Sequence, residues 1–342
     1  MLLAIAGCTS MPTAEELRAT SARFGHDAAR GNDGRARFRE LFCSQVAAAD
    51  PATACDDLLW RLQDEAPTTH PGPPATIRTD LHVFVVSGAF GDCRIEDMFP
   101  YEQEIDRLVA AGHRIEQVKV SGRSSATANA RQIAEAIRAA HVPAGERIVL
   151  IGYSKGAVDI LQLLVDEPDV GQRVSAVVSV SGPILGSPLA QTADWWYRTL
   201  FSHWFADFCA PGDGGVIASL VPATRQAWLA EHPLPDHVRY YSLGAFTTRE
   251  HLSRALTTTW RMLSDRDRRN DGQVVIGDGY IPGGTLLGYA NADHWDVAIA
   301  IDKQLPLLSS RRSPREFPRA ALFDALLAYV SETLDPGAGP GR

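Results

Sequence analysis

Short apolar runs alternate with amphipathic segments over most of the chain after residue 75. The runs consist mainly of Val, Ile, Leu and Tyr and are bounded by Gly or charged residues, as is typical of buried strands. The segments between them carry apolar residues at three- and four-residue spacing, which predicts helices. We expect strands at 82–87, 114–120, 147–151, 174–180, 238–243 and 280–289. We expect helices at 97–111, 125–141 and 157–164.

This alternation predicts an α/β protein with a mostly parallel, doubly wound sheet. Helices would cover both faces of the sheet, and right-handed crossovers would connect the strands. In sheets of this kind the functional residues lie at the carboxyl ends of the strands. The loops that follow the predicted strands are therefore where we look for chemistry.

The N-terminal part has a different pattern. Residues 12–65 are predicted to be helical: an N-terminal cap followed by acidic residues begins at Thr13, and helical apolar spacing occurs at 35–46 and 52–62. The Pro-rich stretch 67–74 predicts a stiff linker. We therefore expect a helical extension with its linker at 9–75, a main domain at 76–336 and a short tail at 337–342.

Composition and charge exclude several classes of protein. The 342 residues are 45% hydrophobic and 22% charged, which is ordinary for a globular chain and excludes a disordered or coiled-coil protein. Lys and Arg total 33 and Asp and Glu total 41, so the formal net charge is −8. Without a long basic run, nucleic acid is not an expected partner. No stretch approaches the roughly 18 apolar residues needed to span a bilayer, which predicts a soluble body.

The N-terminus carries a signal of export. Residues 5–8 read Ile-Ala-Gly-Cys, which resembles the bacterial lipobox, in which Cys8 is lipidated and becomes the mature N-terminus. The apolar stretch before it is short and no Lys or Arg precedes it, so a frayed end with an incidental cysteine is the alternative. The lipobox interpretation makes residues 1–8 a truncated signal and Cys8 a membrane tether. It places the protein on the periplasmic face of a bacterial membrane; secretion is the other exported location.

The remaining four cysteines permit two disulfides in an exported protein, with three pairings open. Cys43 and Cys55 are close in sequence, so a local bond between them is the simplest, and it leaves Cys93 with Cys209. In a cytosolic protein the same residues would be free buried thiols. Because the chain has no Cys-x-x-Cys or Cys/His cluster, we expect no structural zinc site. We also expect no other metal and no cofactor.

A candidate nucleophile follows the strand predicted at 147–151. Residues 152–156 read Gly-Tyr-Ser-Lys-Gly, and a helix-like apolar run comes directly after them. A sharp strand-to-helix turn brings backbone segments close together, requires small residues around the serine and exposes its hydroxyl. On this motif and its context the chain resembles the α/β-hydrolase superfamily over roughly residues 78–335, with Ser154 as nucleophile.

The resemblance implies a Ser–acid–His order along the chain, with the histidine after the last strand. His294 lies there, whereas His251 comes too soon after the strand ending near residue 243. Asp271 lies in Asn-Asp-Gly-Gln-Val, which resembles the segment that carries the acid in bacterial lipases. Asp278, in a Gly-Asp-Gly turn nearer the final strand, is the alternative acid.

An oxyanion hole needs two backbone N–H groups. One is expected from Lys155, whose side chain we expect to be solvent-facing or salt-bridged. The other is expected from Ala89, with Phe90 as the alternative, in the loop after the strand at 82–87.

A long insertion at about 187–236 starts with a Gly-Ser-Pro turn similar to that of lipases and is rich in aromatic residues. We expect most of these aromatics to pack the insertion onto the main domain as a cap, and some to contact substrate. The candidates for substrate contact are Phe90, Tyr153, Trp195 and Trp196.

Together these features predict an exported serine hydrolase that cleaves carboxylic esters, with a lipophilic or lipid ester as substrate. A serine peptidase or an acyltransferase on the same fold is one alternative. A catalytically silent lipoprotein that uses the fold to bind ligands is another.

Overall fold

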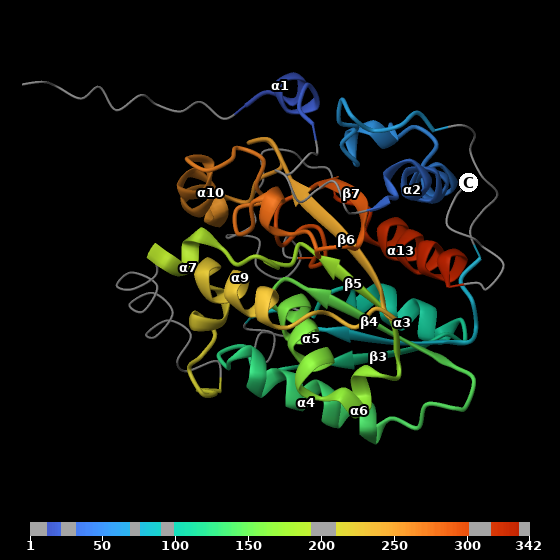
Figure 1. Ribbon diagram of the computed structural model, residues 1–342. Helices are drawn as coiled ribbons and strands as arrows, with labels where there is room; N and C mark the ends of the chain where they lie inside the picture. The colour runs from blue at the N-terminus through green and yellow to red at the C-terminus, as the bar shows by residue number, and fades with distance from the viewer. Residues whose placement is uncertain are drawn as a thin grey trace, which may run out of the picture.

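A seven-stranded parallel sheet forms the centre of the computed structural model (Figure 1). The structure describes residues 12–21, 32–68, 76–89, 99–192, 210–300 and 316–334. Across the sheet the strand order is β1-β7-β6-β5-β4-β2-β3, and every neighbouring pair is parallel. The strands are β1 Asn32–Asp33, β2 Leu81–Val86, β3 Arg114–Val118, β4 Arg147–Tyr153, β5 Val174–Val180, β6 Arg239–Phe246 and β7 Thr285–Asn291.

Both faces of the sheet are buried, as the continuous apolar runs predicted. In β2, Val83 and Val85 belong to one hydrophobic core, whereas Phe84 and Val86 belong to the core on the opposite face. All six residues of this strand are buried. The doubly wound architecture predicted from the sequence is therefore confirmed.

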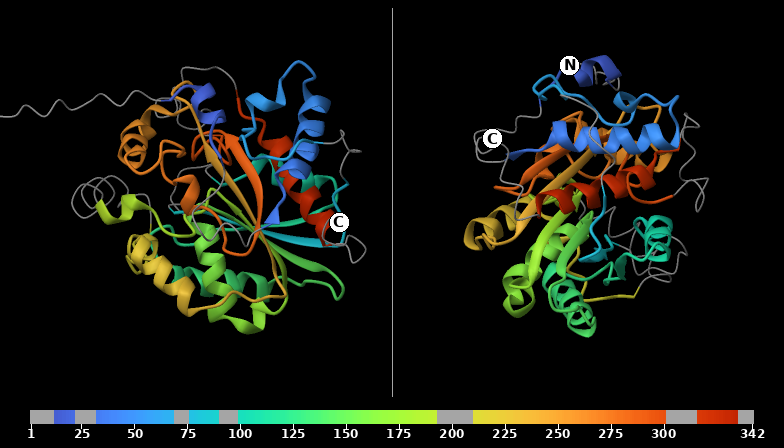
Figure 2. Two further views of the ribbon diagram at one scale, coloured as in Figure 1. Left: turned by 45° about the horizontal axis from the view of Figure 1, so that its top comes forward. Right: turned by 90° about the vertical axis from the view of Figure 1, so that its right-hand side faces the viewer.

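Helices cover the two faces (Figure 2). The core on one face includes residues of α2, α3 and α13, and the core on the other includes residues of α4, α5 and α6. The helices are α1 Ala14–Arg18, α2 Arg35–Ala49, α3 Glu102–Ala110, α4 Ala126–Ala139, α5 Lys155–Asp166, α6 Pro168–Gly171, α7 Pro188–Thr192, α9 Pro222–Glu231, α10 Thr257–Ser264 and α13 Arg319–Thr333. Among the described residues, no helix combines the length and the apolar character that a membrane crossing needs.

The N-terminal extension is packed into the main body. β1 pairs with β7 and adds an edge strand that the sequence pattern did not predict. Helix α2 packs along α13, where the ring of Phe38 meets the ring of Tyr329 edge-on at 6.2 Å. Residues of α2 thus share one hydrophobic core with the central strands.

The helix predicted at 52–62 is wrong. Only a 3-10 turn forms there, at Cys55–Asp57, because the Asp50 side chain accepts hydrogen bonds from the Ala52 amide and the Thr53 hydroxyl and favours a turn. The following backbone pairs with the sheet, since the Trp60 N–H donates to the Tyr289 carbonyl.

A disulfide joins Cys43 on α2 to Cys55 in this turn, 12 residues away. The predicted local pairing is therefore confirmed. Cys8, Cys93 and Cys209 lie outside the described residues.

The final strand begins later than the sequence pattern suggested. We predicted a strand at 280–289, and β7 covers Thr285–Asn291. Pro282 cannot donate a ladder hydrogen bond, and Gly283 has a φ of 78°, so the chain turns before it enters the sheet. The shift brings the end of β7 to within three residues of His294.

Candidate active site

Ser154 lies between the end of β4 at Tyr153 and the start of α5 at Lys155. Its backbone has φ 53° and ψ −128°, a strained conformation for a residue with a side chain. The Ser154 N–H donates to the Val180 carbonyl at 2.9 Å, which ties the turn to the neighbouring strand β5. A strained backbone conformation of this kind persists only where tight packing around the residue maintains it.

The two glycines of the motif allow the neighbouring backbone segments to pack tightly around Ser154. A Cβ at Gly152 would lie 2.4 Å from the Ala157 backbone nitrogen, and a Cβ at Gly156 would lie 2.6 Å from the Ser87 carbonyl oxygen. Real Cβ atoms do not approach backbone so closely, so both positions exclude side chains. The Gly-x-Ser-x-Gly pattern is thus explained by packing of α5 against β4 and β2.

His294 connects the serine to a carboxylate. Its Nε2 lies 2.9 Å from the Ser154 Oγ, and its Nδ1 lies 2.8 Å from Oδ2 of Asp271. Asp271 is fully buried and only 5% of His294 is exposed. The structure therefore brings together three side chains that are far apart in the sequence.

The Asp271 carboxylate is held by its own loop. Its Oδ1 accepts hydrogen bonds from the N–H groups of Gln273 and Val274, at 2.8 and 2.7 Å. The Asp271 carbonyl accepts the N–H of His294 at 2.9 Å, so acid and histidine are linked through backbone as well as side chain. Gly272 has a φ of 94°, which the tight turn requires.

Asp278, the alternative acid, has a different partner. One of its carboxylate oxygens lies 2.8 Å from the guanidinium of Arg266. Burial raises the pKa of Asp278 to about 6, although Arg266 opposes the shift. The imidazole of His294 contacts Asp271 instead.

Tyr153 lies behind the histidine rather than in contact with solvent. It is buried, its hydroxyl donates to the His294 carbonyl at 2.6 Å, and its ring centroid lies 5.3 Å from that of His294. Burial, with a further contribution from Asp271, raises the pKa of Tyr153 well above its ordinary value, so the phenol keeps its proton. Tyr153 thus supports the backbone of His294, and its contact with substrate stays a prediction.

The backbone groups expected to bind an oxyanion lie close to the serine. A Cβ on Gly88 would lie 2.9 Å from the Ser154 Cβ, so the loop that leads to Ala89 runs beside the serine. Lys155 is the first residue of α5, a position whose N–H has no partner within the helix. Phe90, Trp195, Trp196 and Cys8 lie outside the described residues.

The Lys155 side chain is wholly buried, which the sequence analysis did not foresee. Its Nζ donates to Oδ1 of Asp159 at 2.5 Å, and neither side chain is exposed. The salt-bridged alternative is therefore correct and the solvent-facing one is wrong. The signal for the pair was the four-residue spacing of Lys155 and Asp159 on one helix.

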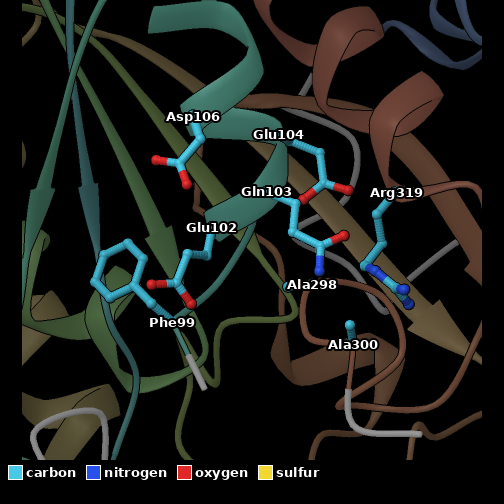
Figure 3. A pocket seen from close by; sticks show the side chains of 8 residues that line it. All are labelled: Phe99, Glu102, Gln103, Glu104, Asp106, Ala298, Ala300 and Arg319. Carbon is cyan, nitrogen blue, oxygen red and sulfur yellow. The ribbon is translucent and has the colours of Figure 1, made fainter. Parts of the chain in front are cut away.

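A cavity of about 180 Å³ lies apart from these residues (Figure 3). In this view the carboxylate of Glu104 on α3 points toward the side where Arg319 lies, and those of Glu102 and Asp106 point the other way. Arg319 also forms a buried ion pair with Asp296 at 3.0 Å. The cavity is lined by Phe99, Glu102, Gln103, Glu104, Asp106, Ala298, Ala300 and Arg319.

In the part of the chain that the structure describes, no group of three or more His, Cys, Asp or Glu could hold a metal ion.

The parallel sheet, the strained turn after β4 and the histidine after β7 define the α/β-hydrolase fold. Comparison with solved structures gives a specific match. The metagenomic carboxyl esterase MGS0156 superposes with a TM-score of 0.82 and 37% sequence identity, covering 94% of this chain and all of the esterase. The chain belongs to the same family as this carboxyl esterase.

Two more distant structures share the fold. The mature lipase BlEst2 of Bacillus licheniformis has a TM-score of 0.54 and 20% identity, covering 71% of this chain and 96% of the lipase. Lipase 1 from Pelosinus fermentans has a TM-score of 0.50 and 11% identity, covering 75% and 99%. No protein-family model matches the sequence, and no curated protein does.

The match to the carboxyl esterase extends beyond the part of the chain that resembles the superfamily in sequence. That part is residues 78–335, about three quarters of the 342 residues. A match that covers 94% of the chain includes much of the N-terminal extension as well. This agrees with the packing of β1 and α2 against the sheet.

Proposed function

We propose that this protein hydrolyses carboxylic esters and that Ser154 is its nucleophile. The observation that carries the proposal is the continuous line of contacts from Asp271 through His294 to the Ser154 hydroxyl. A serine hydroxyl is a weak nucleophile at neutral pH and needs a base that is itself oriented by a carboxylate. Asp271 fixes the proton of the imidazole on Nδ1, which leaves Nε2 free to accept the proton of Ser154.

The reaction proceeds in two halves. Ser154 Oγ attacks the ester carbonyl carbon while His294 takes its proton, and the carbonyl oxygen becomes an oxyanion bound by the N–H groups of Lys155 and Ala89. When the C–O bond to the alcohol breaks, His294 returns the proton to the departing alcohol. Water, deprotonated by the same histidine, then attacks the acyl-serine; as the bond between the acyl carbon and Ser154 Oγ breaks, His294 returns the proton to Ser154 and the carboxylic acid is released.

We propose a lipophilic ester as substrate. The structural relative MGS0156 is a carboxyl esterase, and two structures that share the fold are lipases. The aromatic-rich composition of residues 195–208 suits an apolar acyl or aryl group better than a charged peptide. A panel of p-nitrophenyl esters of increasing acyl length, with amide analogues and added alcohol acceptors, separates the esterase from a peptidase or an acyltransferase.

The assignment of the nucleophile is tested by labelling and substitution. A fluorophosphonate probe should label the wild-type protein at Ser154, and Ser154→Ala should lose both the label and ester hydrolysis. Ser44→Ala is the matched control, because that hydroxyl donates to the Leu41 carbonyl within α2. Ester hydrolysis by Ser154→Ala at the wild-type rate would refute the assignment, and an unlabelled wild-type protein would favour the silent binding scaffold.

We also propose that the protein acts outside the cytoplasm. Disulfides such as Cys43–Cys55 persist in oxidising compartments and are rare in the cytosol. Lipidation of Cys8 remains the proposed means of attachment to a membrane. Metabolic labelling of the full-length chain with a fatty acid analogue, compared with Cys8→Ser, tests it.

A further inference from the structure

The Lys155–Asp159 ion pair is buried in the first turn of α5, next to the proposed nucleophile. Lys155 directly follows the proposed nucleophile and lies at the first position of α5, where the positive end of the helix dipole disfavours a cation. Both side chains have 0% exposure, so both charges have lost their water. A buried ion pair seldom gains stability over apolar residues of the same size. Fold stability alone therefore gives little reason for a lysine at this position.

Two other helices contribute polar groups near the pair. Asn129 of α4 donates from Nδ2 to Asp159 Oδ2 at 2.8 Å, and the same nitrogen donates to the Ser121 carbonyl at 3.0 Å. Arg225 of α9 is buried as well: its pKa is lowered to about 10 by burial, and the charge of Asp159 opposes this. Asp159 is thus a shared acceptor that fixes the direction of the Lys155 side chain.

The first turn of α5 is also where small displacements affect the proposed oxyanion hole. Gly156 packs on the carbonyl groups of Val86 and Ser87, with no room for even a Cβ. Ser87 leads directly to the loop with Ala89, the other proposed N–H donor. A rotation of the Lys155 backbone would therefore change the separation and the angle of the two N–H groups.

We propose that the buried Lys155–Asp159 pair is a positioning device that holds the Lys155 N–H in the direction needed to bind the oxyanion. The inference rests on the proposed function of Ser154. Because the oxyanion exists only in the transition state and the tetrahedral intermediate, the pair affects kcat and leaves KM nearly unchanged. Misplacing a donor by a fraction of an ångström to 1 Å lowers the rate by roughly 10- to 100-fold.

The test uses two variants. Asp159→Asn removes the counter-charge of Lys155 and keeps the shape of the side chain. Because a lone buried ammonium can prevent folding, the double variant Lys155→Met with Asp159→Leu replaces the pair by apolar side chains of similar length. Melting temperature, kcat and KM are measured for both, together with the rate of fluorophosphonate labelling.

We expect the double variant to melt near the wild-type temperature, with kcat and labelling rate at least about tenfold lower and KM within about twofold. Glu65→Gln is the control, because it removes a buried partner of Arg39 in the N-terminal extension; it should lower stability and leave kcat unchanged. Wild-type kcat in a folded double variant would overturn the inference and leave the proposed function intact. An inactive wild-type protein would overturn both.

Discussion

The hydroxyl of Ser187 donates a hydrogen bond to the carbonyl oxygen of Gln273 at 2.8 Å, across 86 residues of sequence. Ser187 lies at the start of the insertion predicted at about 187–236, and its backbone N–H donates to the Leu220 carbonyl farther along the same insertion. The Gln273 N–H in turn donates to the Asp271 carboxylate. Ser187 thus links two segments of the predicted insertion to the loop that carries the proposed acid.

Ser187→Ala should lower kcat. The substitution removes the hydrogen bond to the Gln273 carbonyl, so the Gln273 N–H holds the Asp271 carboxylate less firmly in place. The lost hydrogen bond is worth about 1 kcal/mol. If all of this free energy is added to the activation barrier, the rate falls roughly fivefold. Steady-state ester hydrolysis measures the effect. Ser331→Ala is the matched control, since that buried hydroxyl donates to the Leu327 carbonyl on α13. Equal kcat values for the two variants would contradict the link to the acid.

Tyr153→Phe should reduce activity through the backbone of His294. The substitution removes the hydrogen bond to the His294 carbonyl and leaves that buried oxygen unpaired, at a cost of about 1–3 kcal/mol in the free energy of unfolding. We expect kcat to fall several-fold, with little change in KM. Tyr241→Phe serves for comparison, because the Tyr241 hydroxyl bonds to Thr333 on α13 and should affect stability alone. The prediction fails if both variants are less stable than the wild type but both keep the wild-type kcat.

The sequence could predict the features that are encoded locally. The Gly-x-Ser-x-Gly turn and the Asn-Asp-Gly turn are each set by a few neighbouring residues, so Ser154 and Asp271 could be chosen from short segments. His294 required the order of elements along the chain. In the structure these three side chains are in contact, as the sequence analysis expected.

Other features depend on contacts between distant segments and could not be read locally. β1 has only two residues, and its position is set by pairing with β7, more than 250 residues later. The Lys155 side chain is wholly buried because it pairs with Asp159, whose carboxylate also accepts a hydrogen bond from Asn129 on the separate helix α4. The hydrogen bond from the Tyr153 hydroxyl to the His294 carbonyl joins residues 141 positions apart, so it could not be predicted from the sequence around Tyr153.

The two aspartates considered for the acid should respond differently to substitution. Asp271→Asn should lower kcat by about 10⁴-fold, because an amide holds the imidazole in the wrong tautomer. Asp278→Asn should change kcat little, since its carboxylate pairs with Arg266. The ratio of the two kcat values at a single pH decides between the acids. A large loss for Asp278→Asn with a small one for Asp271→Asn would reverse the assignment.

Asp278 should also make the stability of the protein depend on pH. Its pKa of about 6 lies above the unfolded value near 4, so the folded state binds the proton more tightly. The contribution of this group to stability is therefore full below about pH 4 and is lost as the pH rises through about 6, a change of at most about 3 kcal/mol. Relative to wild type, Asp278→Asn should gain melting temperature between pH 4.5 and 7.5. A difference that stays constant over this range would contradict the raised pKa.

Removal of the Cys43–Cys55 disulfide should destabilise the whole domain rather than the N-terminal extension alone. The bond closes a short loop and is worth about 3 kcal/mol in the free energy of unfolding. Because α2 shares one hydrophobic core with α13 and the central strands, its loosening exposes that core. Cys43→Ser with Cys55→Ser should therefore lower the single melting transition by several degrees, and dithiothreitol should do the same to the wild type. Two separate transitions, with ester hydrolysis kept through the first, would show instead that the extension unfolds on its own.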